Sequence, residues 1–271
     1  MSKGNERFSA AAAAWDTNPD VHRASDSALQ AILRVRPDLA ATTGTGAATE
    51  AGVDVLEIGC GTGLLTLRLV PYVRSIVAVD AASGMIDVLR SKLARAEPAV
   101  QAAVTPVCAL LTDPEDPALP PARAAAAAAE TDASGDPLTA PRRKFDLAIS
   151  HLVLHHIADL SGLLRTLYGC LRPGGQVALT DYEDFGPAAR RFHAEAKMEG
   201  VERHGIPAAW FAGLMRDAGF VDVLVQPAWT MEKNVERYPG EWNNGKPTGV
   251  PLETMDFPFL LCRGTKPTTT A

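Results

Sequence analysis

A glycine-rich turn at 59–63, Gly-Cys-Gly-Thr-Gly, directly follows an apolar run that contains Glu57. Three glycines between a buried strand and a helix permit a tight turn and let a ligand contact the bare backbone. The spacing is G-x-G-x-G, and Leu64 stands where the dinucleotide fingerprint G-x-G-x-x-G has its third glycine. A carboxylate beside the turn is poorly placed for a pyrophosphate and suits a cationic ligand instead. The pattern therefore argues against a nicotinamide-dependent dehydrogenase.

A second acid, Asp80, ends the next apolar run at 75–80, 21 residues after Gly59. An acid at that place can accept hydrogen bonds from both hydroxyls of a ribose. Its alternative role is to cap the helix that follows. The glycine turn, its neighbouring acid and Asp80 together predict an adenosyl cofactor with a charged amino-acid tail.

Histidines supply the candidates for acid–base chemistry. His155 and His156 follow a predicted strand at 145–150, and His193 lies after another at 176–181. A general base is needed only when an acceptor must lose a proton, and packing or hydrogen bonding is the alternative role of these side chains. The predicted substrate-binding residues lie at or after the end of the strand at 176–181: Asp181, Tyr182, His193, His204 and Trp210. The alternative role of Trp210 is packing of its helix into the hydrophobic core.

Strand-like apolar runs alternate with amphipathic helical stretches from position 53 onward. Strands are predicted at 53–58, 75–79, 102–107, 145–150 and 176–181, and helices at 64–70, 84–96 and about 159–171. Such an alternation requires right-handed crossovers and forms a parallel sheet covered on both faces. Two further runs, 221–226 and 257–263, predict the last two strands. The fold class is therefore α/β, an α/β/α sandwich.

The order of these motifs resembles class I S-adenosylmethionine-dependent methyltransferases. The resemblance rests on E-x-G-x-G-x-G after the first strand, D-A-A-S-G-M at 80–85, FDLAIS at 145–150, LVLHHI at 152–157 and LRPGG at 171–175. It covers about 53–181 and, more loosely, 218–220, and it is strongest for small-molecule enzymes of the ubiquinone and menaquinone biosynthesis type. It implies a Rossmann-like, seven-stranded, mostly parallel sheet with an antiparallel last strand. It also implies S-adenosyl-L-methionine as cofactor and in-line transfer of its methyl group to a small-molecule nucleophile (EC 2.1.1 class).

The same resemblance implies the cofactor-binding residues: Glu57, Gly59, Cys60, Gly61, Gly63, Asp80, Ala81, Met85, Asp113, Ser150 and His151. Glu57 and the turn would surround the methionine part, and Asp80 would hold the ribose. Ala81 and Met85 would flank the adenine ring, whereas Asp113 would reach its amine. Ser150 and His151 would face the sulfonium side of the pocket. Met85 as simple core and Asp113 as ordinary loop polarity stay open as alternatives.

The chain divides into a helical lid with a flexible loop at 1–52, a methyltransferase domain at 53–264 and a disordered tail at 265–271. Within the domain, 114–143 is rich in Ala, Pro and Asp and reads as a low-complexity surface insertion. The insert at 237–254 has no evident role. The lid is expected to fold over the cofactor and help bury the reacting groups.

Composition limits the partners. A net charge of −6 gives no electrostatic footprint for nucleic acid, and no apolar run approaches the roughly 18 residues of a membrane helix. Four well-separated cysteines, three of them in apolar runs, read as buried free thiols. We therefore expect a cytoplasmic protein with a small-molecule substrate. The alternative is a methyltransferase-like regulatory subunit that binds the cofactor, lacks turnover of its own and acts through a protein partner.

A metal-dependent mechanism would need several oxygen ligands around one cation. Asp181, Glu183 and Asp184 are close in sequence, and histidines could add ligands. However, alternate residues of a strand point to opposite faces, and no partner on another strand is evident. The sequence therefore predicts no metal site.

Overall fold

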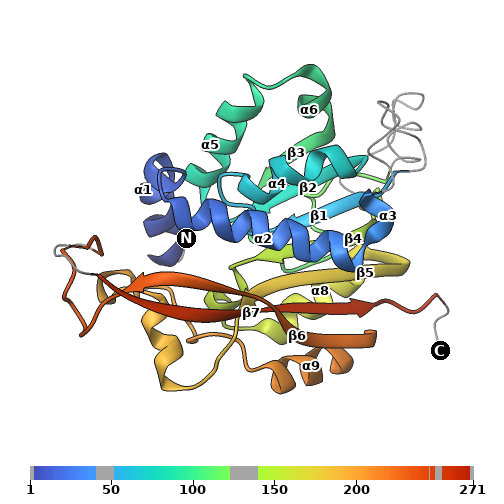
Figure 1. Ribbon diagram of the computed structural model, residues 1–271. Coiled ribbons are helices and arrows are strands. Elements are labelled where there is room, and N and C mark those ends of the chain that lie inside the picture. Colours follow the sequence, from blue (N-terminus) through green and yellow to red (C-terminus); the bar gives the residue numbers. More distant parts are fainter. Residues whose placement is uncertain (1–2, 41–51, 123–139, 244, 248–251, 269–271) are drawn as a thin grey trace.

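The computed structural model describes residues 3–40, 52–122, 140–243, 245–247 and 252–268. In these residues seven strands form a sheet in the order β3-β2-β1-β4-β5-β7-β6 (Figure 1). Strands β1 to β5 pair in parallel, whereas β7 runs antiparallel to both neighbours, β5 and β6. The bounds are β1 Asp54–Ile58, β2 Ser75–Asp80, β3 Val104–Cys108, β4 Phe145–His151, β5 Leu171–Tyr182, β6 Val221–Val235 and β7 Glu253–Thr265. The predicted Rossmann-like sheet with an antiparallel last strand is confirmed.

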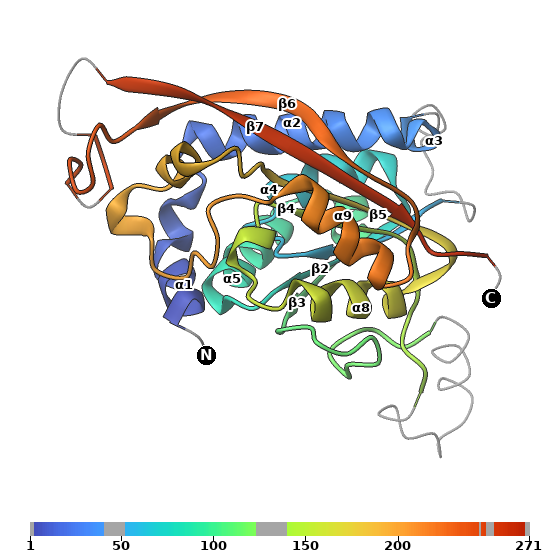
Figure 2. The ribbon, with the colours of Figure 1, turned by 90° about the horizontal axis from the view of Figure 1, so that it is seen from below.

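Helices cover both faces of the sheet, as Figures 1 and 2 show. Their bounds are α1 Lys3–Trp15, α2 Pro19–Val35, α3 Pro37–Ala40, α4 Leu64–Leu69, α5 Ser83–Leu93, α6 Pro98–Ala103, α8 Leu160–Cys170 and α9 Ala208–Asp217. Short 3₁₀ turns are η1 Val70–Tyr72, η2 Leu154–His156, η3 Pro187–Phe192 and η4 Glu195–Lys197.

Alternation along the strands separates two cores. Val55 of β1 packs with α2, α4 and α5, through side chains such as Ile32 and Leu89. The next residue, Leu56, packs with α8 and α9 on the opposite face, through side chains such as Leu164. Successive strand residues point to opposite faces, so a strand that is apolar at both positions must be covered twice. This explains why the first strand reads as an almost continuous apolar run.

The last two strands are much longer than the predicted 221–226 and 257–263. They extend beyond the ends of the parallel strands. Met231 and Val235 of β6 and Phe257 of β7 lie there with Phe192 in a separate buried cluster. The polar residues between these anchors hide the strand pattern in the sequence. The predicted insert at 237–254 therefore overlaps β7 at its end.

Described residues fall within both segments that the sequence predicts to be irregular. Residues 123–139 of the insertion lie outside the described residues, but Leu119 is buried in the core and Pro121 pairs with Arg142. The predicted tail begins within β7, and the Lys266 ammonium donates to the carbonyls of Tyr168 and Leu171. The predicted loop before the first strand falls mostly at 41–51, also outside the described residues.

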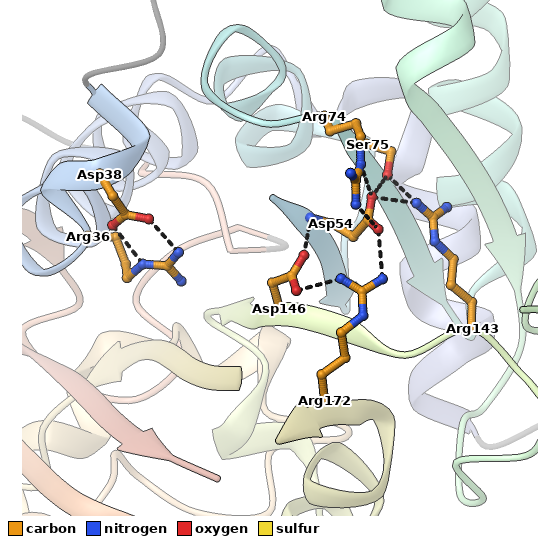
Figure 3. A network of polar contacts seen from close by, with 8 residues as sticks. All are labelled: Arg36, Asp38, Asp54, Arg74, Ser75, Arg143, Asp146 and Arg172. Atoms are coloured by element: carbon orange, nitrogen blue, oxygen red, sulfur yellow. Dashed lines mark hydrogen bonds and ion pairs between the residues drawn. The ribbon is translucent and has the colours of Figure 1, made fainter. Parts of the chain in front are cut away.

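A buried acid binds the amino ends of the central strands together. Asp54 at the start of β1 is fully buried and pairs with Arg74, Arg143 and Arg172, and it accepts from the Ser75 hydroxyl (Figure 3). Burial raises the pKa of Asp54, but hydrogen bonds from Arg74 and Ser75 and the charge of Arg143 outweigh it and hold the pKa well below its usual range. Arg143 belongs to the predicted surface insertion, so the end of that segment is structural.

We expect Asp54→Asn to lower the free energy of unfolding by about 3–5 kcal/mol, because it leaves three guanidinium groups without their buried counter-charge. The matched control is Asp38→Asn, which removes the ion pair between the exposed Asp38 carboxylate and Arg36 (Figure 3) and should cost at most about 1 kcal/mol. Urea unfolding at neutral pH measures both.

The pKa of Asp54 is lowered on folding, so its contribution is complete above the unfolded pKa of about 3.9 and is lost as the pH falls through the lower folded value. The difference between wild type and Asp54→Asn should therefore shrink in acid. A cost below about 1 kcal/mol at pH 7 would contradict the structural role given to this carboxylate.

Candidate active site

The glycine turn lies where β1 ends and α4 begins. The N–H groups of Gly59 and Cys60 donate to the Val79 carbonyl of β2, at 2.8 and 3.1 Å. All three glycines have positive φ, between 54° and 83°. A Cβ at Gly59 would lie 2.2 Å from Val153, whereas a Cβ at Gly61 would meet nothing within 4 Å. The first glycine is needed for close packing, and Gly61 borders open space in which a ligand can approach the backbone.

Asp80, at the end of β2, holds this turn in place. One carboxylate oxygen accepts from the Gly61 N–H and the other from the Ala82 N–H, both at 2.8 Å. Burial raises the pKa of Asp80. Each carboxylate oxygen can accept more than one hydrogen bond, so the group keeps the capacity to bind two ligand hydroxyls. Asp80 does not cap α5, whose N-cap is Ala82 without a side-chain cap, and its contacts to the turn leave the predicted ligand role open.

Glu57 is buried directly beneath the turn. Its carboxylate accepts from the Thr66 hydroxyl at 2.6 Å. Burial, together with the charge of Asp80, raises the pKa of Glu57 to about 8. A buried acid in such surroundings is stabilised in its ionised form by a nearby cation, which suits a ligand with an ammonium group.

The adenine side is only partly as expected. Ala81 follows Asp80 directly at the edge of the turn region. Met85 is buried against Ala12 of α1 and Ala82, so the structure places it in a small core. Asp113 is exposed, and its carboxylate accepts from the Glu115 N–H within its own loop. This contact fits the loop-polarity alternative for Asp113.

Two buried polar groups at the carboxyl end of β4 have no hydrogen-bond partner within the described part of the chain: the Ser150 hydroxyl and His151 Nε2. The other ring nitrogen of His151 lies 2.9 Å from the Thr180 hydroxyl, and burial lowers the pKa of His151 to about 4. Buried polar atoms are almost always hydrogen-bonded in folded proteins. Their position beside the glycine turn is consistent with a bound ligand.

The three candidate catalytic histidines lie together. His155 is buried and its Nδ1 faces both oxygens of the buried Asp181, at 2.8 and 2.9 Å. Its Nε2 lies 3.1 Å from Nε2 of His193. The ring of His156 is 3.9 Å from that of His155, centroid to centroid, and its Nδ1 contacts the Gly200 carbonyl at 2.7 Å.

Burial and the neighbouring His155 lower the pKa of His156 to about 3 and the pKa of His193 well below its usual value. Both rings are therefore neutral at physiological pH. Each neutral imidazole presents one nitrogen lone pair, and Asp181 orients the first ring of the cluster.

The other predicted substrate-binding residues lie in different surroundings. Tyr182 is fully buried, and its ring stacks on Phe192 with centroids 4.0 Å apart. His204 is exposed and lies outside the histidine cluster. Trp210 is 46% exposed on α9, where the Arg203 guanidinium lies over its ring. The Tyr182 ring also contacts the rings of His155 and His193, with centroids 5.0 and 6.2 Å apart, so it borders the histidine cluster. The side chains of His204 and Trp210 lie at the surface, and the substrate roles of all three residues stay predictions.

The N-terminal helix closes one side of this region. Figure 2 shows α1 next to α5, and the Arg7 side chain donates to the Lys197 carbonyl of the segment after β5. Phe8 of α1 contacts His156 edge to face, with centroids 5.0 Å apart. Just after α1, Asp16 accepts from the hydroxyl of Thr62 in the glycine turn and pairs with Lys92. The predicted lid segment thus contacts both the glycine turn and the histidines.

Sequence analysis overlooks several residues of this site. Thr66 is the partner of Glu57, Thr62 ties the turn to Asp16, and Val153 fills the space beside Gly59. A hydroxyl in the first turn of a helix that begins beside a buried acid is a usable signal for Thr66. Val153 offers no such signal, because only the fold brings it to the glycine.

The sequence profile of the family described as "Methyltransferase domain" matches residues 22–225. An uncharacterized methyltransferase of Schizosaccharomyces pombe is 26% identical over 158 residues, which are 58% of this chain and 47% of the relative. Phosphoethanolamine N-methyltransferase 1 of Arabidopsis thaliana is 34% identical over 88 residues, 32% of this chain and 17% of the relative. The chain thus spans less than half the length of these two relatives.

Among solved structures, an S-adenosylmethionine-dependent methyltransferase from Thermotoga maritima has the same fold. The TM-score is 0.53 at 19% sequence identity, and the match covers 96% of this chain and 98% of the other. The finer resemblance to ubiquinone and menaquinone enzymes stays a prediction. In the described residues, no helix has the length and apolar character needed to cross a membrane. The profile match and the fold together show that this chain belongs to the class I S-adenosylmethionine-dependent methyltransferases.

Proposed function

We propose that this protein binds S-adenosyl-L-methionine in the cradle formed by the glycine turn, Glu57 and Asp80, and transfers its methyl group to a small-molecule nucleophile. The observation that carries this proposal is the open space at Gly61 beside the Asp80 carboxylate. The buried Ser150 hydroxyl at the end of β4, which has no hydrogen-bond partner among the described residues, supports it. These groups fit the cofactor of the family.

The chain's own residues divide the work of binding. Asp80 would accept from the ribose hydroxyls, and Glu57 would provide negative charge near the amino-acid tail. The backbone of the turn would lie against the methionine part, because Gly61 leaves no side chain in the way. When bound, the cofactor supplies an activated methyl group on a sulfonium, so alignment of the acceptor and exclusion of water are the main tasks of the protein.

The acceptor would approach from the side of the histidines. Val153, which contacts the glycine turn, directly precedes η2, and η2 carries His155 and His156. The histidine cluster therefore lies close to the turn. Phe8 and the segment after β5 cover this region and would limit the access of water.

Relatives support a small acceptor. Phosphoethanolamine N-methyltransferases are among the proteins similar to this chain, and their name specifies a small amine as acceptor. The regulatory-subunit alternative remains the second candidate function, because an intact cofactor site is compatible with either.

We expect Asp80→Ala to weaken binding of S-adenosylhomocysteine by on the order of 100-fold, since two hydrogen bonds to a charged group are lost. Asp80→Asn keeps one acceptor oxygen and should lie between. Isothermal titration calorimetry measures the affinity. Asp87→Ala, an exposed acid of α5, is the matched control and should bind like wild type.

Because Asp80 also holds the glycine turn, thermal unfolding of each variant must accompany the titration. Equal affinity of Asp80→Ala and wild type would refute the proposed cofactor cradle. Weak binding by a variant that unfolds at the wild-type temperature would place the loss in the site itself.

Deletion of residues 1–17 should lower the affinity for S-adenosylhomocysteine on the order of tenfold, because it removes the helix that contacts His156 and the Asp16 contact to Thr62. It leaves Asn18, the cap of α2, in place. Asp16→Ala should have a smaller effect in the same direction, and Glu6→Ala, exposed on α1, should have none. Unchanged affinity and turnover in the deletion variant would eliminate the lid role.

Turnover is tested with methyl-labelled cofactor and acceptor mixtures sorted by the attacking atom: phenols and catechols, amines including phosphoethanolamine, and thiols. Label should pass to one class with wild type and not with Asp80→Ala. If wild type binds S-adenosylhomocysteine but labels no acceptor class, the regulatory-subunit alternative gains and the enzymatic proposal fails.

A further inference from the structure

We propose that His155, His156 and His193 form a binding site for a divalent transition-metal ion, best suited to Zn²⁺, with Asp181 as the carboxylate that orients His155. One ring nitrogen from each histidine lies within 4.8 Å of the other two. Three histidines from two separate segments, η2 and the residue after η3, meet at this point. The sequence predicts no metal site because it shows no ligand on another strand, whereas the structure brings His155 and His156 of η2 to His193.

Hydrogen bonds determine which nitrogens are available. A carboxylate only accepts, so Nδ1 of His155 carries the hydrogen that faces Asp181, and its Nε2 presents a lone pair in the neutral ring. The Gly200 carbonyl likewise requires the hydrogen of His156 on Nδ1, which leaves Nε2 of that ring with its lone pair. His193 joins them through Nε2 once its hydrogen is on Nδ1.

The spacing fits a metal site after a small adjustment. With Zn–N bonds of about 2.0–2.1 Å, two ligands of a tetrahedral site are about 3.3 Å apart. Nε2 of His155 and Nε2 of His193 are 3.1 Å apart. The ligand nitrogens of the three histidines lie within 4.8 Å of one another. Metal binding would require small side-chain rotations that bring the more distant nitrogens closer.

The surroundings match those of known metal-binding histidines. Such residues almost always donate the second ring N–H to a carboxylate or a backbone carbonyl, which fixes the ring and its tautomer. His155 has the carboxylate of Asp181, and His156 has the carbonyl of Gly200. Asp181 itself is held by the backbone N–H groups of His155 and Tyr182. The buried acid also supplies negative charge beside the ion.

Two nearby cations are held by other partners. The Lys233 ammonium donates to the Phe192 carbonyl, and the Arg7 guanidinium donates to the Lys197 carbonyl. A neutral carbonyl does not cancel their charges, which disfavour a second cation at His193. The charges of Glu199 near Arg7 and Asp20 near Lys233 oppose that effect, and the imidazoles themselves contribute neutral ligands. The resulting set of three histidines leaves a fourth coordination position open, as in catalytic zinc sites.

This open position would bind an oxygen or sulfur atom of the methyl acceptor and lower its pKa. That role rests on the proposed function, whereas metal binding does not. The two can therefore fail separately, because the site is tested with the metal alone and without cofactor.

The test is titration of Zn²⁺ into untagged, chelator-treated full-length protein in competition with a chromophoric chelator. Wild type should bind one ion per chain, and His156→Ala and His193→Ala should each lose this binding. Asp181→Asn keeps all three ligands and should weaken binding about 10–100-fold. His204→Ala, an exposed histidine outside the cluster, is the matched control and should bind like wild type.

Circular dichroism of each variant establishes that it is folded, and Co²⁺ in place of Zn²⁺ provides a visible spectrum that reports four-coordinate geometry. The proposal is overturned if wild type binds no Zn²⁺, or if His193→Ala binds it as tightly as wild type. In that case the same contacts constitute a hydrogen-bonded relay from Asp181 through His155 to His193.

Discussion

The structure of the site depends on one carboxylate that holds two loops. Asp80 accepts from the N–H of Gly61 and from the N–H of Ala82, so it fixes the glycine turn after β1 relative to the loop after β2. The turn can adopt this shape only because its glycines have positive φ and Gly59 lies against Val153. Val153 in turn precedes the two adjacent histidines. Cofactor cradle and histidine cluster are therefore positioned by a single chain of contacts.

The ion pairs that stabilise the sheet and the groups of the proposed ligand site lie at opposite ends of the strands. At the amino end of β1, Asp54 forms ion pairs with three arginines from different parts of the chain (Figure 3). At the carboxyl ends, the buried Ser150 hydroxyl and His151 Nε2 have no partner within the described residues. In open α/β sheets ligands bind outside the carboxyl ends of the strands, so this division of polar groups is expected.

The sequence predicts the central elements well because their signals are local. The apolar runs of β1 and β2, the glycine turn and Asp80 each lie within a few residues, and the structure brings them together as expected. The length of β6 is missed because the buried cluster that holds its far end, in which Met231 lies with Phe192, joins distant segments. Arg143 reads as part of a surface insertion for the same reason, since its partner Asp54 is 89 residues away.

The substrate wall shows the limit most clearly. Tyr182 and Asp181 are neighbours on one strand, yet the tyrosine stacks on Phe192 in a core while the acid binds His155. The tyrosine ring also contacts the ring of His155, with centroids 5.0 Å apart, so both neighbours border the histidine cluster. Alternation along a strand predicts opposite directions for the two side chains and does not predict this arrangement. The grouping of His193 with His155 depends on the path of the chain after β5, which carries no periodic signal.

A crystal structure of the full-length protein with S-adenosylhomocysteine bound tests the central claim most directly. The account predicts both ribose hydroxyls within hydrogen-bond distance of the Asp80 carboxylate, the amino-acid tail against the glycine turn, and the sulfur directed toward the histidine cluster. Ligand density elsewhere on the chain, or a ribose held without Asp80, would contradict it.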